Sequence, residues 1–176
     1  MSTDSRWAWR WRAAAVLAAV ILVVWLWRGS DEARVAEVMD DVARALTQST
    51  RDPEGGRSEQ LNRAFVHAFA PEARISAPDL VLTDAGPDAL AAAARRVLAG
   101  FDSTRVQLGP PTIEVAASGR EASAQLQVVA SASGPDIGTL TDVREARVEL
   151  RETDAGWRIV SVALTAPSHD EPEARP

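Results

Sequence analysis

The segment VREARVELRETDAGWRIVSVAL, residues 143–164, decides the fold of this chain. Apolar and polar side chains alternate from Glu145 to Arg151, which is the period of a strand with one buried face, and WRIVSVAL follows as a second, mostly apolar run. The tripeptide Asp-Ala-Gly at 154–156 separates the two runs and is typical of a tight turn. The segment therefore predicts an antiparallel hairpin with strands at 139–152 and 157–166.

Two more strands are predicted upstream. The stretch EASAQLQVVASAS at 121–133 alternates small apolar residues with Ser and Gln. The stretch RVQLGPPTIEVAA at 105–117 also alternates, and its Gly-Pro-Pro at 109–111 predicts a bend because proline cannot donate to a strand ladder.

Before residue 103 the apolar residues recur at helical spacing instead. Amphipathic helices are expected at 31–48, 59–70 and 88–100, the first two capped by Ser30 and Ser58. Pro71 ends the second helix, and short strand pieces are expected at 73–77 and 79–83. Three helices followed by a curved antiparallel sheet make an α+β layer fold.

The N-terminus predicts a membrane anchor. Every residue from Ala13 to Trp27 is apolar, and tryptophans flank the run at both ends. Such aromatic belts favour an uncleaved transmembrane signal anchor at 13–28, although the run is shorter than the ~20 residues that usually cross a bilayer. A cleaved signal peptide is the alternative, but no A-x-A-like pair follows the run.

The arginines before the span place residues 1–12 in the cytoplasm by the positive-inside rule. For a bacterium, which the Ala- and Arg-rich composition suits, this predicts a single-pass inner-membrane protein with a periplasmic domain at 31–166 and a disordered tail at 167–176. The lipid bilayer is then the first expected partner.

Composition excludes several kinds of site. The chain has no Cys and no Tyr, all 19 basic residues are Arg, and there are 2 His. Disulfides, thiolate zinc sites, a cysteine nucleophile and Schiff-base lysine chemistry are therefore excluded. We expect no metal and no cofactor, and the net charge of −6 argues against nucleic-acid binding. His67 lies off the apolar face of its helix and is expected at the surface.

The stretch LNRAFVHAFAPEARI at 61–75, the helix at 88–100 and the hairpin at 143–164 resemble the nuclear transport factor 2-like superfamily, in particular its SnoaL-like members. The resemblance covers about residues 31–166. It implies a cone-shaped (cystatin-like) domain in which three helices close a curved sheet around a pocket. Ketosteroid isomerase and scytalone dehydratase of this superfamily need tyrosines, so their sites cannot be carried over.

One candidate site remains. Asp142 and Arg144 lie two residues apart on the mostly apolar face of the hairpin's first strand, which is expected to point inward with Leu140, Ala146, Val148 and Leu150. With Trp157 and Asp79 they are the candidate pocket residues for a small apolar or anionic ligand. Limonene epoxide hydrolases of the superfamily use an Asp-Arg-Asp arrangement, for which Asp79 or Asp84 would supply the second acid. The competing interpretation is a salt bridge at the wet end of the sheet.

Three functions stay open. The first is a membrane-tethered, non-catalytic ligand-binding or accessory domain. The second is a periplasmic assembly subunit of an envelope transport or secretion complex, because inner-membrane subunits of type IV secretion and proteins associated with Mce lipid import combine one N-terminal span with this fold. The third is a small hydrolase or isomerase using Asp142 and Arg144. A homodimer is expected through the outer face of strand 121–133, whose side chains are short and uncharged: Ser123, Gln125, Gln127, Val129 and Ser131.

Overall fold

The structure is a computed structural model that describes residues 30–49, 54–78, 80–82, 86–134 and 138–167. The expected anchor at 13–28, the tail beyond residue 167, Asp79 and Asp84 lie outside the described residues. Among the described residues, no helix is long and apolar enough to cross a membrane.

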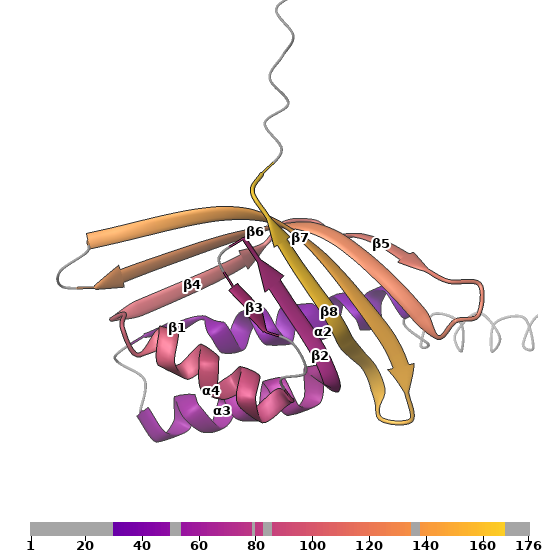
Figure 1. Cartoon of the computed structure of the whole chain (residues 1–176), viewed down its shortest axis with the longest axis horizontal. Helices are drawn as coiled ribbons and strands as arrows, with labels where there is room; N and C mark the ends of the chain where they lie inside the picture. The colour runs from indigo at the N-terminus through magenta and orange to yellow at the C-terminus, as the bar shows by residue number, and fades with distance from the viewer. Residues whose placement is uncertain (1–29, 50–53, 79, 83–85, 135–137, 168–176) are drawn as a thin grey trace, which may run out of the picture.

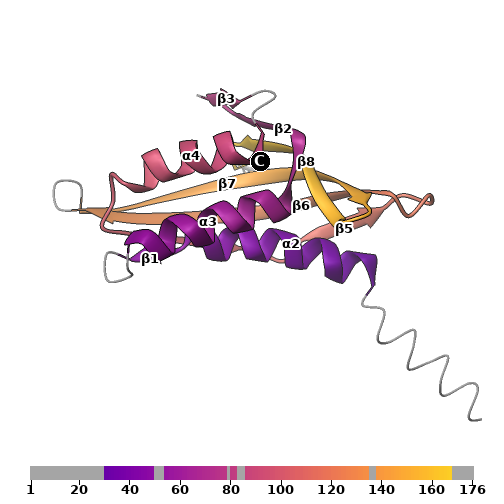
Figure 2. The same ribbon diagram turned by 90° about the horizontal axis from the view of Figure 1, so that it is seen from below.

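Three helices form one layer, as expected: α2 at Asp31–Leu46, α3 at Glu54–Ala68 and α4 at Pro87–Leu98. Ser30 caps α2, because its Oγ accepts a hydrogen bond from the backbone N–H of Ala33 at 3.3 Å. Pro87 occupies the first turn of α4, where its missing N–H costs nothing. Figures 1 and 2 show this layer lying under one face of the sheet.

The sheet has eight strands in the order β1-β4-β6-β7-β8-β2-β3, with β5 paired beside β6. Their bounds are Gln48–Ser49, Phe69–Ala77, Leu80–Leu82, Ser103–Leu108, Thr112–Val115, Glu121–Gly134, Gly138–Thr153 and Gly156–Thr165 for β1 to β8. The sheet curls over the helices in Figure 1. All pairings are antiparallel except that of β2 with β8, which is parallel and corrects the expectation of a purely antiparallel sheet.

The β7–β8 hairpin confirms the prediction from residues 143–164. Thr153 pairs with Gly156, so only residues 154 and 155 form the turn. Gly156 has a φ of 101°, a conformation that an L side chain rarely adopts, and this explains the glycine at the start of β8. The bend predicted at 109–111 also exists, since β4 and β5 pair with successive parts of β6.

Both ends of α3 differ from the prediction. The helix begins at Glu54, so Ser58 lies inside it and does not cap it. Glycine in a first turn costs only about 1 kcal/mol relative to alanine, and the early turn is held because Arg57 Nη1 donates to the Ser49 carbonyl at 3.2 Å.

The far end of α3 comes two residues early, at Ala68, and Phe69 begins β2. Pro71 pushes the residue before it into an extended conformation, and Phe69 pairs with Ile159 of β8. Phe69 had fitted the helical pattern because it follows Phe65 by four residues. Their rings do meet, at a centroid distance of 5.0 Å.

Arg158 joins the hairpin to α3. Its Nη1 donates to the carbonyls of Val66 and His67 in the last turn of that helix. Helix C-termini leave such carbonyls without intrahelical partners, and a cation there also opposes the negative end of the helix dipole. The arginine of the Gly-Trp-Arg-Ile-Val sequence is therefore a helix cap, a role that the sequence pattern did not reveal.

Helix α4 ends at Leu98 with Ala99 as its cap, close to the expected end at Gly100. Leu90 is buried, as the apolar pattern predicted, and so is Ala91, which that pattern did not include. Val97 was expected to face inward but is 63% exposed. Leu98, the next residue in the same turn of α4, packs against the core instead, so Val97 lies on the side of the helix that faces away from it.

Candidate functional site

The interior between the sheet and the helices is apolar. The inner faces of β6, β7 and β8 contribute buried Ala, Leu, Val, Ile and Trp side chains: Ala122, Ala124, Leu126, Ala146, Val148, Leu150, Trp157 and Ile159. Among the described residues, no polar residue other than the indole of Trp157 and no charged residue is buried. Ala73, Ala91 and Ala124 have no accessible surface, so no void large enough for a water molecule touches them.

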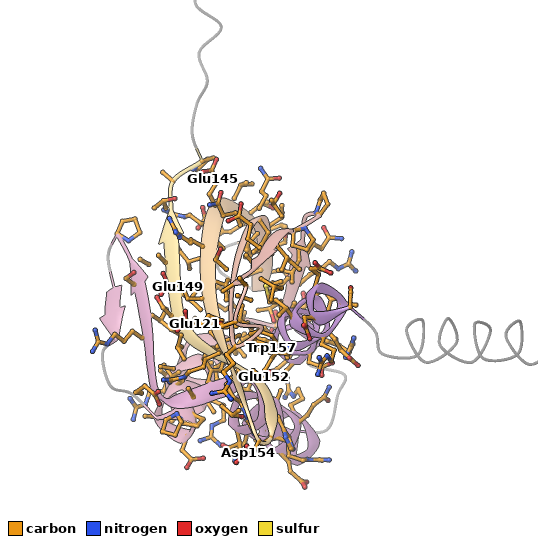
Figure 3. The ribbon with its side chains drawn as sticks, turned by 90° about the vertical axis from the view of Figure 1, so that its right-hand side faces the viewer. Glu121, Glu145, Glu149, Glu152, Asp154 and Trp157 are labelled. Atoms are coloured by element: carbon orange, nitrogen blue, oxygen red, sulfur yellow. The ribbon has the colours of Figure 1, made fainter. Side chains whose placement is uncertain are left out.

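Trp157 lies in this interior, where the sequence had placed it as a candidate pocket residue. It is 3% exposed, and its Nε1 is a buried donor with no hydrogen-bond partner. Its neighbour across the strands is Glu152, whose Oε1 lies 3.7 Å from Nη1 of Arg34 at the start of α2 (Figure 3). The ring therefore packs the interior at the end of the sheet nearest the start of α2.

Asp142 and Arg144 do come together. Arg144 Nε donates to Asp142 Oδ2 at 2.9 Å, and the two side chains are 32% and 61% exposed. The pair lies beyond the end of β8, because the last residue of β8 to pair with β7 is Thr165, opposite Glu145. No described acid joins them, since Asp79 and Asp84 lie outside the described residues.

The face of β7 that was expected to point inward is buried only from Ala146 to Leu150. Leu140 is 54% exposed, and Asp142 is exposed beside it. The reason is strand length: β7 has 16 residues and β8 has 10, so the first part of β7 extends past the strand and the helices that would cover it. Alternation correctly predicted which side chains of β7 share a face. It could not predict where along β7 the packing of β8 and the helices ends.

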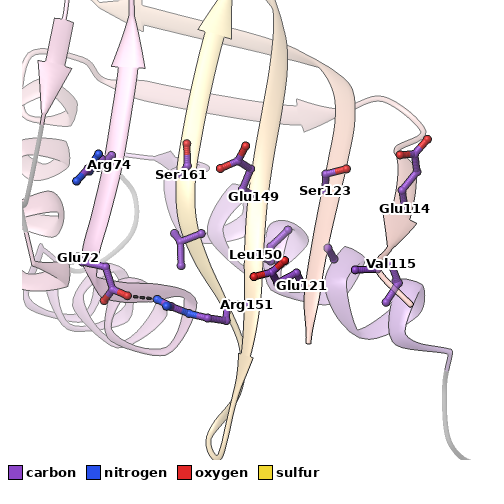
Figure 4. A pocket seen from close by; sticks show the side chains of 13 residues that line it. Glu72, Arg74, Glu114, Val115, Glu121, Ser123, Glu149, Leu150, Arg151 and Ser161 are labelled. Atoms are coloured by element: carbon purple, nitrogen blue, oxygen red, sulfur yellow. Dashed lines mark hydrogen bonds and ion pairs between the residues drawn. The ribbon is translucent and has the colours of Figure 1, made fainter. Parts of the chain in front are cut away.

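The opposite face of the sheet carries a hollow of about 760 Å³ that sequence reasoning did not find. Its charged lining comes from four strands, β2, β5, β6 and β7: Glu72, Arg74, Glu114, Glu121, Glu149 and Arg151. Arg151 on β7 forms an ion pair with Glu72 on β2, and β8 lies between these two strands (Figure 4). The signal was present in the sequence, because Glu145, Arg147, Glu149 and Arg151 alternate with the apolar residues of β7.

Charged side chains rim this outer hollow, which is open to solvent. Among the described residues, no three His, Asp or Glu side chains are grouped so that they could hold a metal ion. A smaller groove of about 380 Å³ lies between α2 and α3 and includes His67. His67 is exposed, as its position on the helix predicted.

The comparisons with known proteins agree with this architecture. A family model described as the SnoaL-like domain matches residues 57–163. No curated protein sequence matches the chain.

Several solved structures share the fold. The Kfla4162 protein from Kribbella flavida superposes with a TM-score of 0.64 at 18% identity, covering 79% of this chain and 92% of its own. A nuclear transport factor 2-like superfamily protein from Salmonella enterica gives 0.64 at 18% identity over 84% of this chain and 98% of its own. A protein provisionally named a scytalone dehydratase, from Novosphingobium aromaticivorans, gives 0.61 at 17% identity over 78% and 84%.

At these sequence identities the structural similarity establishes the fold only. Function has to be inferred from the residues of the site. The family match covers more than half of the chain, including helix α4, most of α3, all of β7 and β8 up to residue 163. The chain therefore belongs to the SnoaL-like domain family.

Proposed function

We propose that this chain is a membrane-tethered, non-catalytic accessory domain. The observation that carries the proposal is the interior of the cone, where the described residues bury no acid, base or hydroxyl side chain. General acid–base catalysis and oxyanion stabilisation need such groups in a shielded position near the substrate. In the described part of the chain, the one buried polar side-chain atom without a partner is the indole N–H of Trp157, which cannot act as an acid or base.

The tether supports an accessory role. Helix α2 begins at Asp31, within three residues of the end of the expected anchor at 13–28. So short a connection holds the domain next to the bilayer. The proposal places the anchor in the bacterial inner membrane and the domain in the periplasm. The charged outer hollow is then the surface that fits a subunit of an envelope complex.

An enzymatic role for Asp142 and Arg144 is the competing proposal, and provisional enzyme names occur among the structural neighbours. The geometry favours it less. Asp142 is 61% exposed, so water competes for any substrate group that it would bind, and its partner Arg144 is already engaged at 2.9 Å.

Complementation of a deletion strain tests the proposal. The readout is an envelope phenotype of that strain, such as detergent sensitivity. We expect the Asp142→Asn/Arg144→Met double variant to restore the wild-type phenotype. A variant with residues 1–29 replaced by a cleavable signal peptide should not, because its domain is released from the membrane.

The opposite pattern would overturn the proposal. If the released domain restores the phenotype and the double variant does not, at equal protein levels, the activity resides in the pair and the tether is dispensable. A full-length chain that is extracted from membranes by alkaline carbonate would independently refute the anchor.

A further inference from the structure

The first part of β7 has one open edge. Residues Gly138–Arg144 pair with β6 on one side, but on the other side β8 stops opposite Glu145. Within the described part of the chain, no residue pairs with this second edge. A strand edge presents a row of backbone N–H and C=O groups that can accept another strand. Both faces are also uncovered here, since residues 138–142 are all exposed.

From this edge we infer that two copies of the chain pair antiparallel through Gly138–Arg144, with the two-fold axis at Thr141. In this register Thr141 lies opposite Thr141 of the second copy, Thr139 lies opposite Val143, and Leu140 lies opposite Asp142. The outer face therefore carries Thr–Thr and Thr–Val cross-strand pairs, which stabilise antiparallel sheets. The full seven-residue edge is used, and no two like charges lie directly opposite.

The Asp142–Arg144 ion pair acquires a role in this register. The two Asp142 side chains become diagonal neighbours, about 7–8 Å apart between backbones. Each is neutralised by its own Arg144, whose Nε lies 2.9 Å from the carboxylate. Charged side chains on the inner face of an edge strand also hinder its pairing with unrelated strands. Asp142 and Arg144 would therefore make this edge selective for a partner strand that tolerates them.

The chain's own tail is a poorer occupant of the edge. If β8 simply continued, residues 166–172 would lie opposite 144–138. That stretch is APSHDEP, which contains two prolines and two acids and has low strand propensity. Asp170 would also become a diagonal neighbour of Asp142, which places two like charges together.

The two-fold geometry suits a tethered protein. The dyad that relates two antiparallel edge strands is perpendicular to the sheet, so both helix layers lie on the same side of the joined sheet. Both copies of α2 therefore leave from the same layer, which is compatible with two anchors in one membrane. The pairing itself does not require the tether, which would only raise the local concentration.

Disulfide trapping tests the inference, because the full-length chain has no cysteine of its own. Thr141→Cys places two sulfurs across the dyad, where backbone Cα atoms of facing residues lie about 4.5–5.5 Å apart, within disulfide range. Thr139→Cys is the matched control: it lies on the same face of the same edge, but its copies would be about 14 Å apart. Two differently tagged full-length copies are expressed together, oxidised in cells and examined on non-reducing gels.

We expect Thr141→Cys to give the mixed-tag dimer and Thr139→Cys to give several-fold less. Co-expressed Thr139→Cys and Val143→Cys should restore the dimer. Adding Arg144→Met should reduce trapping at position 141, because the two Asp142 carboxylates lose their counterions.

Equal trapping at 139 and 141, or none at 141, would overturn the inference. So would trapping at 141 that appears only after truncation at Pro167, which would assign the edge to the tail. Efficient trapping by Val129→Cys with none by Thr141→Cys would assign the contact to the outer face of β6 instead.

Discussion

Removing either charge of the Asp142–Arg144 pair should cost little stability. If the pair faced the interior, as its strand face predicted, it would be partly desolvated, and its disruption would lower the free energy of unfolding by about 1–3 kcal/mol. The structure changes that expectation, because the side chains are 61% and 32% exposed. The variants to compare are Asp142→Asn, Arg144→Met and the double variant.

The magnitude follows from the geometry. Two unit charges separated by 2.9 Å attract by about 1.4 kcal/mol in water. Ordering two side chains offsets part of this, and exposed pairs measured by double-mutant cycles retain about 0.2–1 kcal/mol. Because Asp142 is largely exposed and Arg144 partly so, we expect an interaction energy of about 0.5 kcal/mol between the two side chains, near the middle of that range.

Urea unfolding of the full-length chain in detergent, followed by circular dichroism, gives the coupling from the four proteins. It should shrink further in about 1 M salt, where the screening length falls to about 3 Å. A coupling above about 2 kcal/mol would refute the reasoning, because it requires a desolvated pair. Single variants that are more stable than the wild type would also refute the reasoning. They would mean that the pair is strained in the native state, which is typical of functional sites.

Four further outcomes are expected. Leu150→Ala should lower the free energy of unfolding by about 2–5 kcal/mol, and Val97→Ala by less than about 0.5 kcal/mol, because Leu150 is 2% exposed and Val97 is 63% exposed; urea unfolding measures both. Arg158→Met should cost about 1–2 kcal/mol by uncapping α3, and protease cleavage within α3 should become faster. Gly156→Ala should cost about 1–2 kcal/mol through its positive φ, whereas Gly100→Ala, which has no such φ, should melt near the wild-type temperature. A variant beginning at Ser30 should fold by itself, and a random-coil circular dichroism spectrum would contradict the domain boundary.

Local patterns predicted most of the fold. The alternation in β6 and β7, the turn at 154–156 and the helical spacing in α2 each depend on near neighbours. All three predicted the right kind of element, although α2 ends at Leu46 and not at residue 48. The boundary at Phe69 was wrong because a helical pattern and a strand pairing competed for one residue. Pairing with Ile159, 90 positions away in the chain, decided it, and periodicity contains no information about such contacts.

In the candidate site, too, local patterns were predictable from the sequence and contacts between distant segments were not. Alternation placed Asp142 and Arg144 on one face, and the structure shows them bonded. The exposure of Asp142 and Arg144 is set by the end of β8 opposite Glu145, and the sequence of β7 contains no information about the length of β8. The outer hollow depends on five strands lying side by side, so the alternating charges of β7 could suggest a polar face but not its shape.

The central claim is that the interior of the cone is a packed apolar core and not a binding pocket. Ala124→Leu tests it most directly, because Ala124 has no exposed surface and faces that interior from β6. In a packed core the added carbons should lower the free energy of unfolding by about 1–3 kcal/mol. Ala130→Leu, on the same strand but exposed, should change it by less than about 0.5 kcal/mol. An Ala124→Leu variant as stable as the wild type, or more stable, would mean that the cone holds an empty pocket and would contradict the account.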